Sequence, residues 1–304
     1  MRRAHLVLAA VVVVWAGSFS VIKELLDDGV ASGDIAIIRY AIAAPGFAYI
    51  LWRARGLAGL TRADAARVVV AGLTVVVGYH LCLNVGERYT TSGVAALVVA
   101  LAPALTLLLA LLLRLERAQS GRIVGLAVAF AGVAVVVTLG TGQSLSAESA
   151  KGPLIVLGAP LSFAFYNVIL KPLLGRYDLL ALTAATSLVG MAGLVPFVRA
   201  STIDTVTGPS GGEVLLLLYL GVLATLLGYI GWNVGLRSLG ATRAVAFTNA
   251  NAPLALTFGA VFLGEPVTVW LALGAALVVA GIATAQGASL RVIRRAGALA
   301  PSER

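Results

Sequence analysis

The sequence predicts an all-α integral membrane protein with ten transmembrane helices, built as two inverted repeats of five helices. Three observations predict this class: the composition, a duplication of the chain, and the placement of the basic residues. Of the 304 residues, 60% are hydrophobic and 12% are charged, and the mean hydropathy is +1.00. Soluble domains carry about 25% charged residues, so the composition excludes an ordinary soluble domain.

The second observation is that the chain repeats itself after about half its length. GYHLCLNVGER, which starts at Gly78, returns as GYIGWNVGLR, which starts at Gly228. Four more residues return after 149 or 150 residues, with Pro103, Glu116, Gly125 and Gly132 matched by Pro253, Glu265, Gly274 and Gly281. Such a repeat indicates a duplication. Two halves with an odd number of spans each must lie in the bilayer in opposite orientations, as in many secondary transporters.

The spans follow from the length that a membrane requires. A helix that crosses the hydrocarbon core needs about 20 residues, so charged and Gly/Pro-rich interruptions divide the chain into ten spans. They cover residues 6–22, 35–52, 68–86, 93–113, 121–139, 154–172, 179–198, 214–236, 244–263 and 267–286. The predicted organisation is a first repeat over 1–140, a polar linker over 141–152, a second repeat over 153–290 and a basic cytoplasmic tail over 291–304.

The third observation is the placement of lysine and arginine. With both termini in the cytoplasm, all but five of the 22 basic residues fall on the cytoplasmic side, and the exceptions are Lys23, Arg39, Arg88, Lys151 and Arg199. Cytoplasmic loops carry the excess of Lys and Arg, so this distribution predicts both the orientation and the number of spans. The basic residues punctuate apolar runs instead of clustering on one surface, so the net charge of +9 does not indicate nucleic-acid binding.

The sequence lacks the residues that several kinds of functional site require. Cys82 is the only cysteine, and His5 and His80 are the only histidines, so we expect no disulfide framework, no metal site, no cofactor and no HExxH-type enzyme. A channel would carry rings of like charge or a filter motif, and the sequence shows neither. The basic start of the chain imitates a signal peptide, but the apolar stretch continues to Ile22, so we expect it to remain as the first span.

Polar groups recur at depths where the spans should be apolar. Pro103 and Pro253 fall near the middle of the fourth and ninth spans, and a proline frees the carbonyl four residues earlier, here that of Val99 or Asn249. A free carbonyl must face protein or a water-filled cavity, so we expect both breaks to flank one central site, with a simple kink as the alternative. We predict a substrate pocket formed by Ser18, Tyr79, His80, Asn84, Tyr166, Asn167, Tyr229, Trp232, Asn233, Asn249 and Asn251. Taken singly, each of these residues is better explained by helix packing or interfacial anchoring.

Titratable groups inside the spans are few. His80 is the one histidine deep in a span, and a proton relay is the alternative to packing. No span carries a carboxylate at its centre, because Glu116 and Glu265 lie at the ends of spans; this weakens the case for a proton-driven drug antiporter. Lys23 and Arg39 would neutralise the acidic first external loop or reach the lipid headgroups, with an outer gate for an anionic group as the alternative.

Longer segments carry a resemblance to a known family. WAGSFSVIKELL from Trp15, RYAIAA from Arg39, the segment from Thr91 to Glu116 and its counterpart from Ala241 to Glu265 resemble an EamA-domain protein of the drug/metabolite transporter superfamily. The similarity covers both halves, although Phe163 stands in the second half where the first has Trp15. It implies a ten-helix carrier that exports amino acids or other small metabolites from bacterial cells.

The functional hypothesis is therefore a multi-pass permease of the inner or plasma membrane that exports a small organic metabolite, most simply an amino acid or a derivative, by alternating access. Its partners would be this substrate and the lipid bilayer, with no nucleic acid, and a homodimer stays open. The alternatives are a drug or other metabolite carrier that works by proton antiport, and a membrane scaffold without transport.

Overall fold

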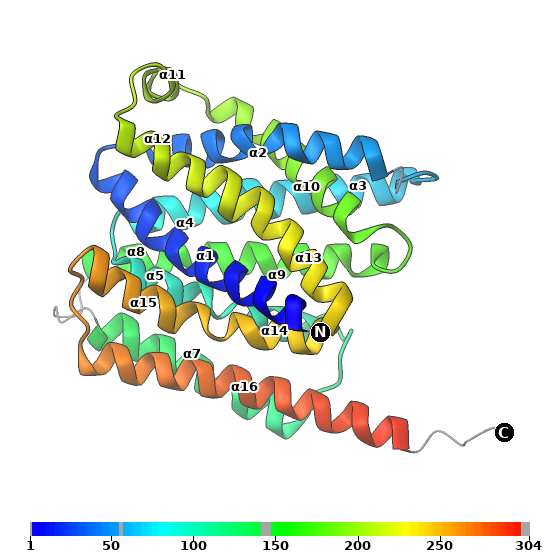
Figure 1. Cartoon of the computed structure of the whole chain (residues 1–304). Helices are drawn as coiled ribbons and strands as arrows, with labels where there is room; N and C mark the ends of the chain where they lie inside the picture. The colour runs from blue at the N-terminus through cyan, green and yellow to red at the C-terminus, as the bar shows by residue number, and fades with distance from the viewer. Residues whose placement is uncertain (1, 55–56, 141–146, 299–304) are drawn as a thin grey trace.

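The structure is a computed structural model that describes residues 2–54, 57–140 and 147–298. The described residues form helices that pack side by side in a bundle, with no strand among them (Figure 1). The first half, residues 2–140, contains α1 (Arg2–Asp27), α2 (Ser32–Ala54), α3 (Arg62–Gly72), η1 (Leu73–Gly78), α4 (Tyr79–Glu87), α5 (Ser92–Val99), α6 (Ala102–Leu112), α7 (Ser120–Val135) and η2 (Val136–Gly140).

The second half, residues 147–298, follows a similar order, with additional short helices and with its first span divided into two helices. It contains α8 (Ala147–Val156), α9 (Gly158–Leu170), η3 (Lys171–Leu173), α10 (Leu179–Leu194), η4 (Val195–Phe197), α11 (Ala200–Thr207), α12 (Gly211–Leu218), η5 (Tyr219–Leu227), α13 (Gly228–Leu239), α14 (Ala241–Thr248), α15 (Asn251–Phe262) and α16 (Val269–Ala298). Of the predicted linker, residues 147–152 begin α8 and residues 141–146 lie outside the described part. Residues 291–298 of the predicted tail continue α16, and 299–304 also lie outside it.

Nine helical stretches among the described residues are long and apolar enough to cross a membrane, and each coincides with a predicted span. The predicted span over 244–263 is not among them, because α14 ends at Thr248 and α15 begins only at Asn251. Pro253 follows this break directly, as the lost hydrogen bond of a proline predicts. The chain is a multi-pass membrane protein.

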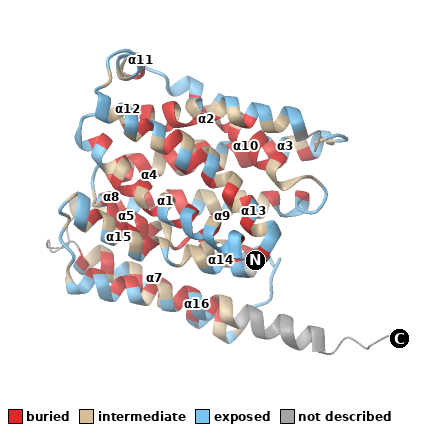
Figure 2. Cartoon of the chain, viewed as in Figure 1, coloured by how far each residue is buried: buried red, intermediate tan, exposed pale blue. Residues whose placement is uncertain are grey.

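The outside of the bundle carries many exposed apolar side chains. Leu112, Phe262 and Val269 are more than two-thirds exposed, and Figure 2 shows buried residues on the inward sides of helices whose outward sides are open. Helices that are apolar all round belong in a membrane or a large core. The outward residues therefore have lipid as their natural neighbour.

Short polar side chains start several of these helices. Thr61 accepts a hydrogen bond from the Asp64 N–H at 3.1 Å, Thr91 from the Val94 N–H at 3.3 Å, and Asp178 from the Ala181 N–H at 2.9 Å. Each satisfies a donor that the first turn of a helix leaves unpaired. The helices α3, α5 and α10 thus begin at fixed residues.

Glycines join α7 of the first half to α16 of the second. A Cβ atom at Gly125 would lie 2.6 Å from the Gly281 carbonyl oxygen, and one at Gly132 would lie 2.7 Å from the Val278 nitrogen. The pairing runs backwards along α16 as it runs forwards along α7, so the two helices are antiparallel, as Figure 1 shows. Small residues at such a crossing let two backbones approach closely in lipid.

This crossing generates a stability prediction with a matched control in one helix. Gly281→Ala places a Cβ against the Ala129 backbone, whereas Gly287→Ala meets nothing within 4 Å. Overpacking of this kind costs about 1–3 kcal/mol. We expect Gly281→Ala to lower the thermal unfolding midpoint in detergent while Gly287→Ala leaves it unchanged. Equal midpoints for the two variants would contradict the close approach.

Candidate functional site

Aromatic side chains from both halves meet inside the bundle. The ring of Trp15 in α1 lies 5.5 Å from that of Trp232 and 6.1 Å from that of Tyr229, both in α13. Tyr229 in turn lies 6.2 Å from Phe47 in α2. The predicted pocket residues Tyr229 and Trp232 are therefore brought together, by a tryptophan that the sequence prediction did not include.

A second group of rings continues from α4 to α9. Tyr79 lies 4.9 Å from the His80 ring and 6.3 Å from Phe163, and Phe163 lies 5.7 Å from Tyr166. Tyr40 of α2 connects the two groups, because its hydroxyl lies 3.0 Å from Nε2 of His80 and 3.4 Å from the Tyr229 hydroxyl. We call these rings, Trp15, Tyr40, Phe47, Tyr79, His80, Phe163, Tyr166, Tyr229 and Trp232, the aromatic cluster.

Most rings of the aromatic cluster are only half-buried, although they contact one another from several helices. Trp15, Tyr79, Phe163, Tyr166, Tyr229 and Trp232 are of this kind, whereas Tyr40, Phe47 and His80 are buried. Rings that only fill a core lose nearly all their exposed surface. Apolar walls with a few convergent polar groups are typical of small-molecule sites, so the half-buried rings make this region the candidate substrate site.

At the glycine of the repeated GY motif, each half is in close contact with a helix of the other half. A Cβ at Gly228 would lie 2.6 Å from Nε1 of Trp15, which donates a 2.9 Å hydrogen bond to the Ala224 carbonyl. A Cβ at the matching Gly78 would lie 2.7 Å from the Ser162 hydroxyl of α9. Gly78 is the last residue of the π-helical segment η1, and Gly228 directly follows the π-helical segment η5; this distortion is often found at functional sites.

Arg39 adds a positive charge beside the aromatic cluster. Its side chain is 6% exposed, and Nε donates a 2.8 Å hydrogen bond to the Thr225 hydroxyl. Its positive charge lies close enough to Tyr40, Tyr79 and His80 to interact with them electrostatically. No carboxylate of the described residues forms an ion pair with it.

The position of Arg39 corrects the sequence interpretation. We expected it to neutralise the acidic external loop or to reach the headgroups, but α2 begins at Ser32, so Arg39 lies about two turns inside the helix and faces η5. Lys23 does pair with an acidic residue beside that loop, Asp27 at the end of α1, at 2.7 Å. Tyr40, the residue after Arg39, was missed altogether. The adjacent arginine and tyrosine within a span were the signal that could have indicated both.

Four predicted pocket residues use their polar groups in packing. Asn84 donates to the Ser32 carbonyl at 3.0 Å, Asn167 to the Thr106 hydroxyl at 3.3 Å, Asn233 to the Tyr229 carbonyl at 2.8 Å, and Ser18 to the Val14 carbonyl at 3.0 Å. A direct role in holding substrate stays a prediction for them.

The helix breaks lie where the prolines predict them. The chain leaves α-helical geometry between Val99 and Ala102 and between Thr248 and Asn251, so Asn249 lies in a break and Asn251 at the start of the next helix. Oδ1 of Asn251 is buried and has no hydrogen-bond partner among the described residues. The rings of Pro103 and Pro253 line apolar grooves against α16. Their gating role stays a prediction.

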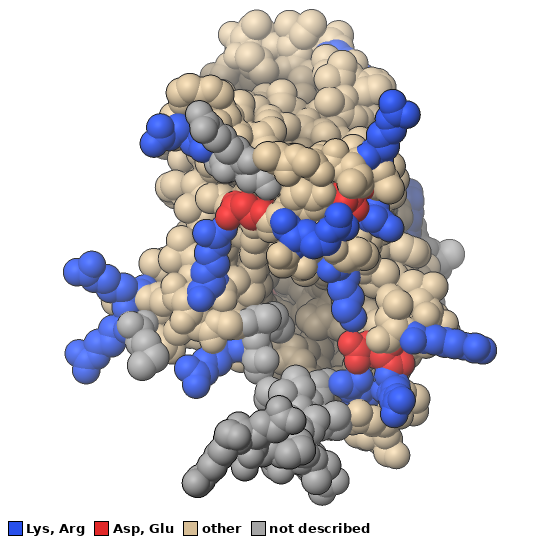
Figure 3. Space-filling model, turned by 90° about the vertical axis from the view of Figure 1, so that its right-hand side faces the viewer, with Lys and Arg blue, Asp and Glu red and all other residues tan. Residues whose placement is uncertain are grey.

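One end of the bundle gathers basic residues. In Figure 1 this is the right-hand end, where α1 and α3 begin and α2 and α13 end. Figure 3 looks onto it and shows Lys and Arg around a hollow, with few acidic residues between them. We call this end the basic face. Among the described side chains, no group of three or more His, Cys, Asp or Glu is arranged to hold a metal ion.

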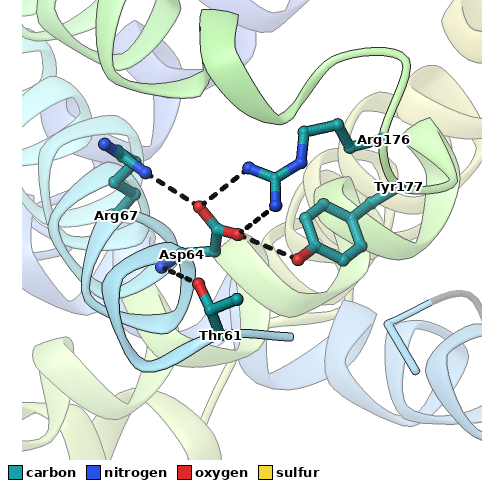
Figure 4. Close-up of polar contacts among 5 residues, drawn as sticks. All are labelled: Thr61, Asp64, Arg67, Arg176 and Tyr177. Carbon is teal, nitrogen blue, oxygen red and sulfur yellow. Dashed lines mark hydrogen bonds and ion pairs between the residues drawn. The ribbon is translucent and has the colours of Figure 1, made fainter. Parts of the chain in front are cut away.

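Asp64 ties the two halves together at the basic face (Figure 4). Its carboxylate lies 2.8 Å from Arg67 of its own helix, 3.0 Å from Arg176 of the second half, and accepts a 2.9 Å hydrogen bond from the Tyr177 hydroxyl. The carboxylate is 2% exposed, while both arginines are about half-exposed. One buried anion thus holds two cations that would otherwise repel each other.

A second acidic residue nearby joins two helices of the second half. Asp178 caps α10 and forms an ion pair with Arg237 at the end of α13. Burial alone would raise the pKa of the Asp178 carboxyl, but hydrogen bonds from the Ala181 N–H and from Arg237 lower it below the usual aspartate value. The Asp178–Arg237 ion pair is therefore fully formed near neutral pH.

Comparison with known proteins agrees with this arrangement. The EamA-like transporter family matches residues 2–138 and 150–285, nearly all of both halves. The chain belongs to the EamA-like transporter family. Members of this family are transporters, so the protein moves a small molecule across a membrane and is not an enzyme.

Individual relatives cover almost the whole chain. An uncharacterized transporter of Archaeoglobus fulgidus is 32% identical over 91% of this chain and 96% of its own length. A probable terminal-alkyne amino-acid exporter of Streptantibioticus cattleyicolor is 30% identical over 93% of each chain, and a probable amino-acid metabolite efflux pump of Salmonella typhimurium is 28% identical over 90% and 91%. A crystal structure with 20% identity shares the fold, with a TM-score of 0.61 over 96% of this chain and 99% of its own.

The Asp64 contacts predict a large effect for a single substitution. Asp64→Ala would leave Arg67 and Arg176 without their shared anion, so we expect a lower thermal unfolding midpoint and less protein in the membrane. Asp204→Ala removes an exposed carboxylate from α11 and should change neither quantity. If the two variants unfold at the same temperature, Asp64 does not tie the halves together.

Proposed function

We propose that this EamA-family protein is a carrier of the cell membrane that exports an amino acid or a related small organic metabolite by alternating access. The relatives named as an amino-acid exporter and as an amino-acid metabolite efflux pump support this substrate class. The observation that carries the proposal is Arg39, a buried cation without an ion-pair partner among the described residues, next to half-buried aromatic rings.

A buried arginine within a membrane span is costly and usually marks a functional site. The planar guanidinium suits a carboxylate, which it can bind through two parallel hydrogen bonds. The Thr225 hydroxyl fixes Nε of Arg39, and Thr225 is itself held by a 2.8 Å hydrogen bond to the Leu220 carbonyl. Arg39 would thus hold the carboxylate of the substrate, and the aromatic cluster would cover its apolar part.

Two inverted halves would provide the movement. Two observations support opposite orientations of the two halves in the membrane. Gly78 and Gly228 each contact a helix of the other half closely, and α7 crosses α16 in the antiparallel direction. In this proposal α14 and α15 together form the tenth crossing, and the basic face lies in the cytoplasm in agreement with the excess of Lys and Arg there. The halves would rock about the aromatic cluster and expose it to each side in turn.

The alternatives differ in what they require. A scaffold has no use for a buried arginine that lacks an ion-pair partner among the described residues, and no cofactor is needed for carrier-type transport. A drug carrier would not require an anion-binding group. A homodimer stays a prediction.

The test is counterflow of radiolabelled amino acids in proteoliposomes. Wild-type protein should exchange amino acids and discriminate against their methyl esters, which lack the carboxylate. Hydrogen bonds to charged groups contribute about 1.5–3 kcal/mol, so Arg39→Gln should weaken apparent affinity for the acid about 10- to 100-fold and abolish the discrimination.

The matched control is Arg88→Gln, which removes an exposed arginine at the end of α4 and should transport like the wild type. An Arg39→Gln protein of normal abundance that still prefers the acid over its ester would overturn the assignment. Flux that never saturates and never exchanges would overturn the carrier itself.

A further inference from the structure

A buried carboxyl group lies at the end of the bundle opposite the basic face. Glu87 ends α4 and is fully buried, and neither of its carboxyl oxygens has a hydrogen-bond partner among the described residues. The predicted third span stopped at residue 86, so sequence reasoning placed Glu87 outside the membrane. An unpartnered ionised carboxylate is very costly to bury, whereas a neutral carboxylic acid is far less so.

Glu87 ends a polar stripe that starts at the aromatic cluster. His80, Asn84 and Glu87 are four and three residues apart, a spacing that puts them on one helix face, and all three are buried. Nδ1 of His80 and Oδ1 of Asn84, like both oxygens of Glu87, have no protein partner within the described ranges. Through its other nitrogen, His80 contacts Tyr40. The stripe thus links the candidate substrate site to Glu87.

The second half lacks this stripe. In the repeat, Asn84 corresponds to Asn233, whereas His80 corresponds to Ile230 and Glu87 to Leu236. The second half packs the same helix with apolar residues at those two positions. The fold therefore does not require a histidine and a glutamate there, and the two titratable residues are specific to the first half.

Two carboxyl groups lie near each other at this end, Glu87 and Glu265, and their contacts favour Glu87 as the proton carrier. Its electrostatic neighbours are Glu265, Lys23 and Asp27, and Lys23 is already paired with Asp27. Glu265 accepts hydrogen bonds from the N–H groups of Ser92 and Gly93, at 2.7 and 3.1 Å, and from the Ser92 hydroxyl at 2.9 Å. Glu265 is thus already engaged by three donors, whereas Glu87 has none among the described residues, so Glu87 is the carboxyl group of this pair that is open to proton binding.

Other helices against α4 bring few charges. From α2 come Asp34, Arg39 and Tyr40; Asp34 is bonded to Thr202 and Arg39 to Thr225. From α9 comes Tyr166, and α5 contributes no titratable side chain. From α8 come Glu148, whose side chain lies outside the described part, and Lys151, whose ammonium lies 3.8 Å from the centre of the Tyr89 ring.

We propose that Glu87 is the proton-binding site that couples export to the proton gradient, with His80 and Asn84 as its link to the substrate site. This rests on the proposed function. The neutral acid releases its proton to water on one side, and the carboxylate takes up a proton from water on the other. No bond other than O–H breaks or forms. Glu265 joins the second half to the start of α5, so separation of this tie would give Glu87 access to water at that end.

The first test needs no substrate. Infrared difference spectra of the protein in liposomes, recorded against pH, should show the C=O stretch of a protonated carboxyl group that disappears as the pH rises. The band should be absent from Glu87→Gln and from Glu87→Leu, which installs the residue type of the second half. It should persist in Glu24→Gln, which changes an exposed glutamate near the same end. Persistence of the band in both Glu87 variants would overturn the proposal.

The second test measures coupling. In proteoliposomes that exchange an amino acid, an imposed pH gradient should drive accumulation at least tenfold by the wild type and by Glu24→Gln. Glu87→Gln should exchange without responding to the gradient. A Glu87→Gln protein that still accumulates substrate would sink the proposal, as would a wild type that exchanges but ignores the gradient. If the wild type does not exchange at all, the proposed function fails, and the infrared band still decides whether Glu87 binds a proton.

Discussion

A charged or polar side chain inside a membrane span must find its partner in protein or in water, because lipid provides none. Several such groups, within the spans or at their ends, find a partner on another helix or segment. Asp64 binds two arginines and a tyrosine, and Glu265 caps α5. These pairs fix how the helices of the two halves meet. Arg39 has a hydrogen bond to Thr225 but no ion pair, and Glu87 has no hydrogen-bond partner, among the described residues; packing alone does not explain these two residues.

The general architecture could be predicted because its causes lie in local sequence. Apolar runs of the length of a bilayer gave the spans, and prolines at the same place in both halves gave the breaks before Pro103 and Pro253. Glycines seven residues apart, at Gly125 and Gly132 and again at Gly274 and Gly281, indicated helix faces that allow close approach, although their partner was not known. The structure brings these faces to each other.

The candidate site was predicted less well, for two physical reasons. The first reason is that the predicted helix ends were wrong by a few residues. Near a membrane boundary, such an error decides whether a charged residue is expected in solvent or buried. Arg39 and Glu87 are both buried in the structure. Sequence also cannot tell a side chain that lines a cavity from one that binds a neighbouring helix. Asn84 and Asn167 donate to α2 and α6, whereas Tyr229 and Trp232 meet Trp15 across the halves.

The central claim of the proposed function is that the half-buried rings form a substrate site, which would be reached by water from the hollow of the basic face. The direct measurement is labelling of Tyr229→Cys with a membrane-impermeant thiol reagent, in protein whose native Cys82 is replaced by serine. Phe47→Cys, a buried ring of the same cluster, is the control. The account predicts that Tyr229→Cys reacts in inside-out vesicles, much more slowly in right-side-out vesicles, and that Phe47→Cys reacts in neither. A Tyr229→Cys protein that stays unlabelled from both sides would mean that the aromatic cluster is packed core and would contradict the account.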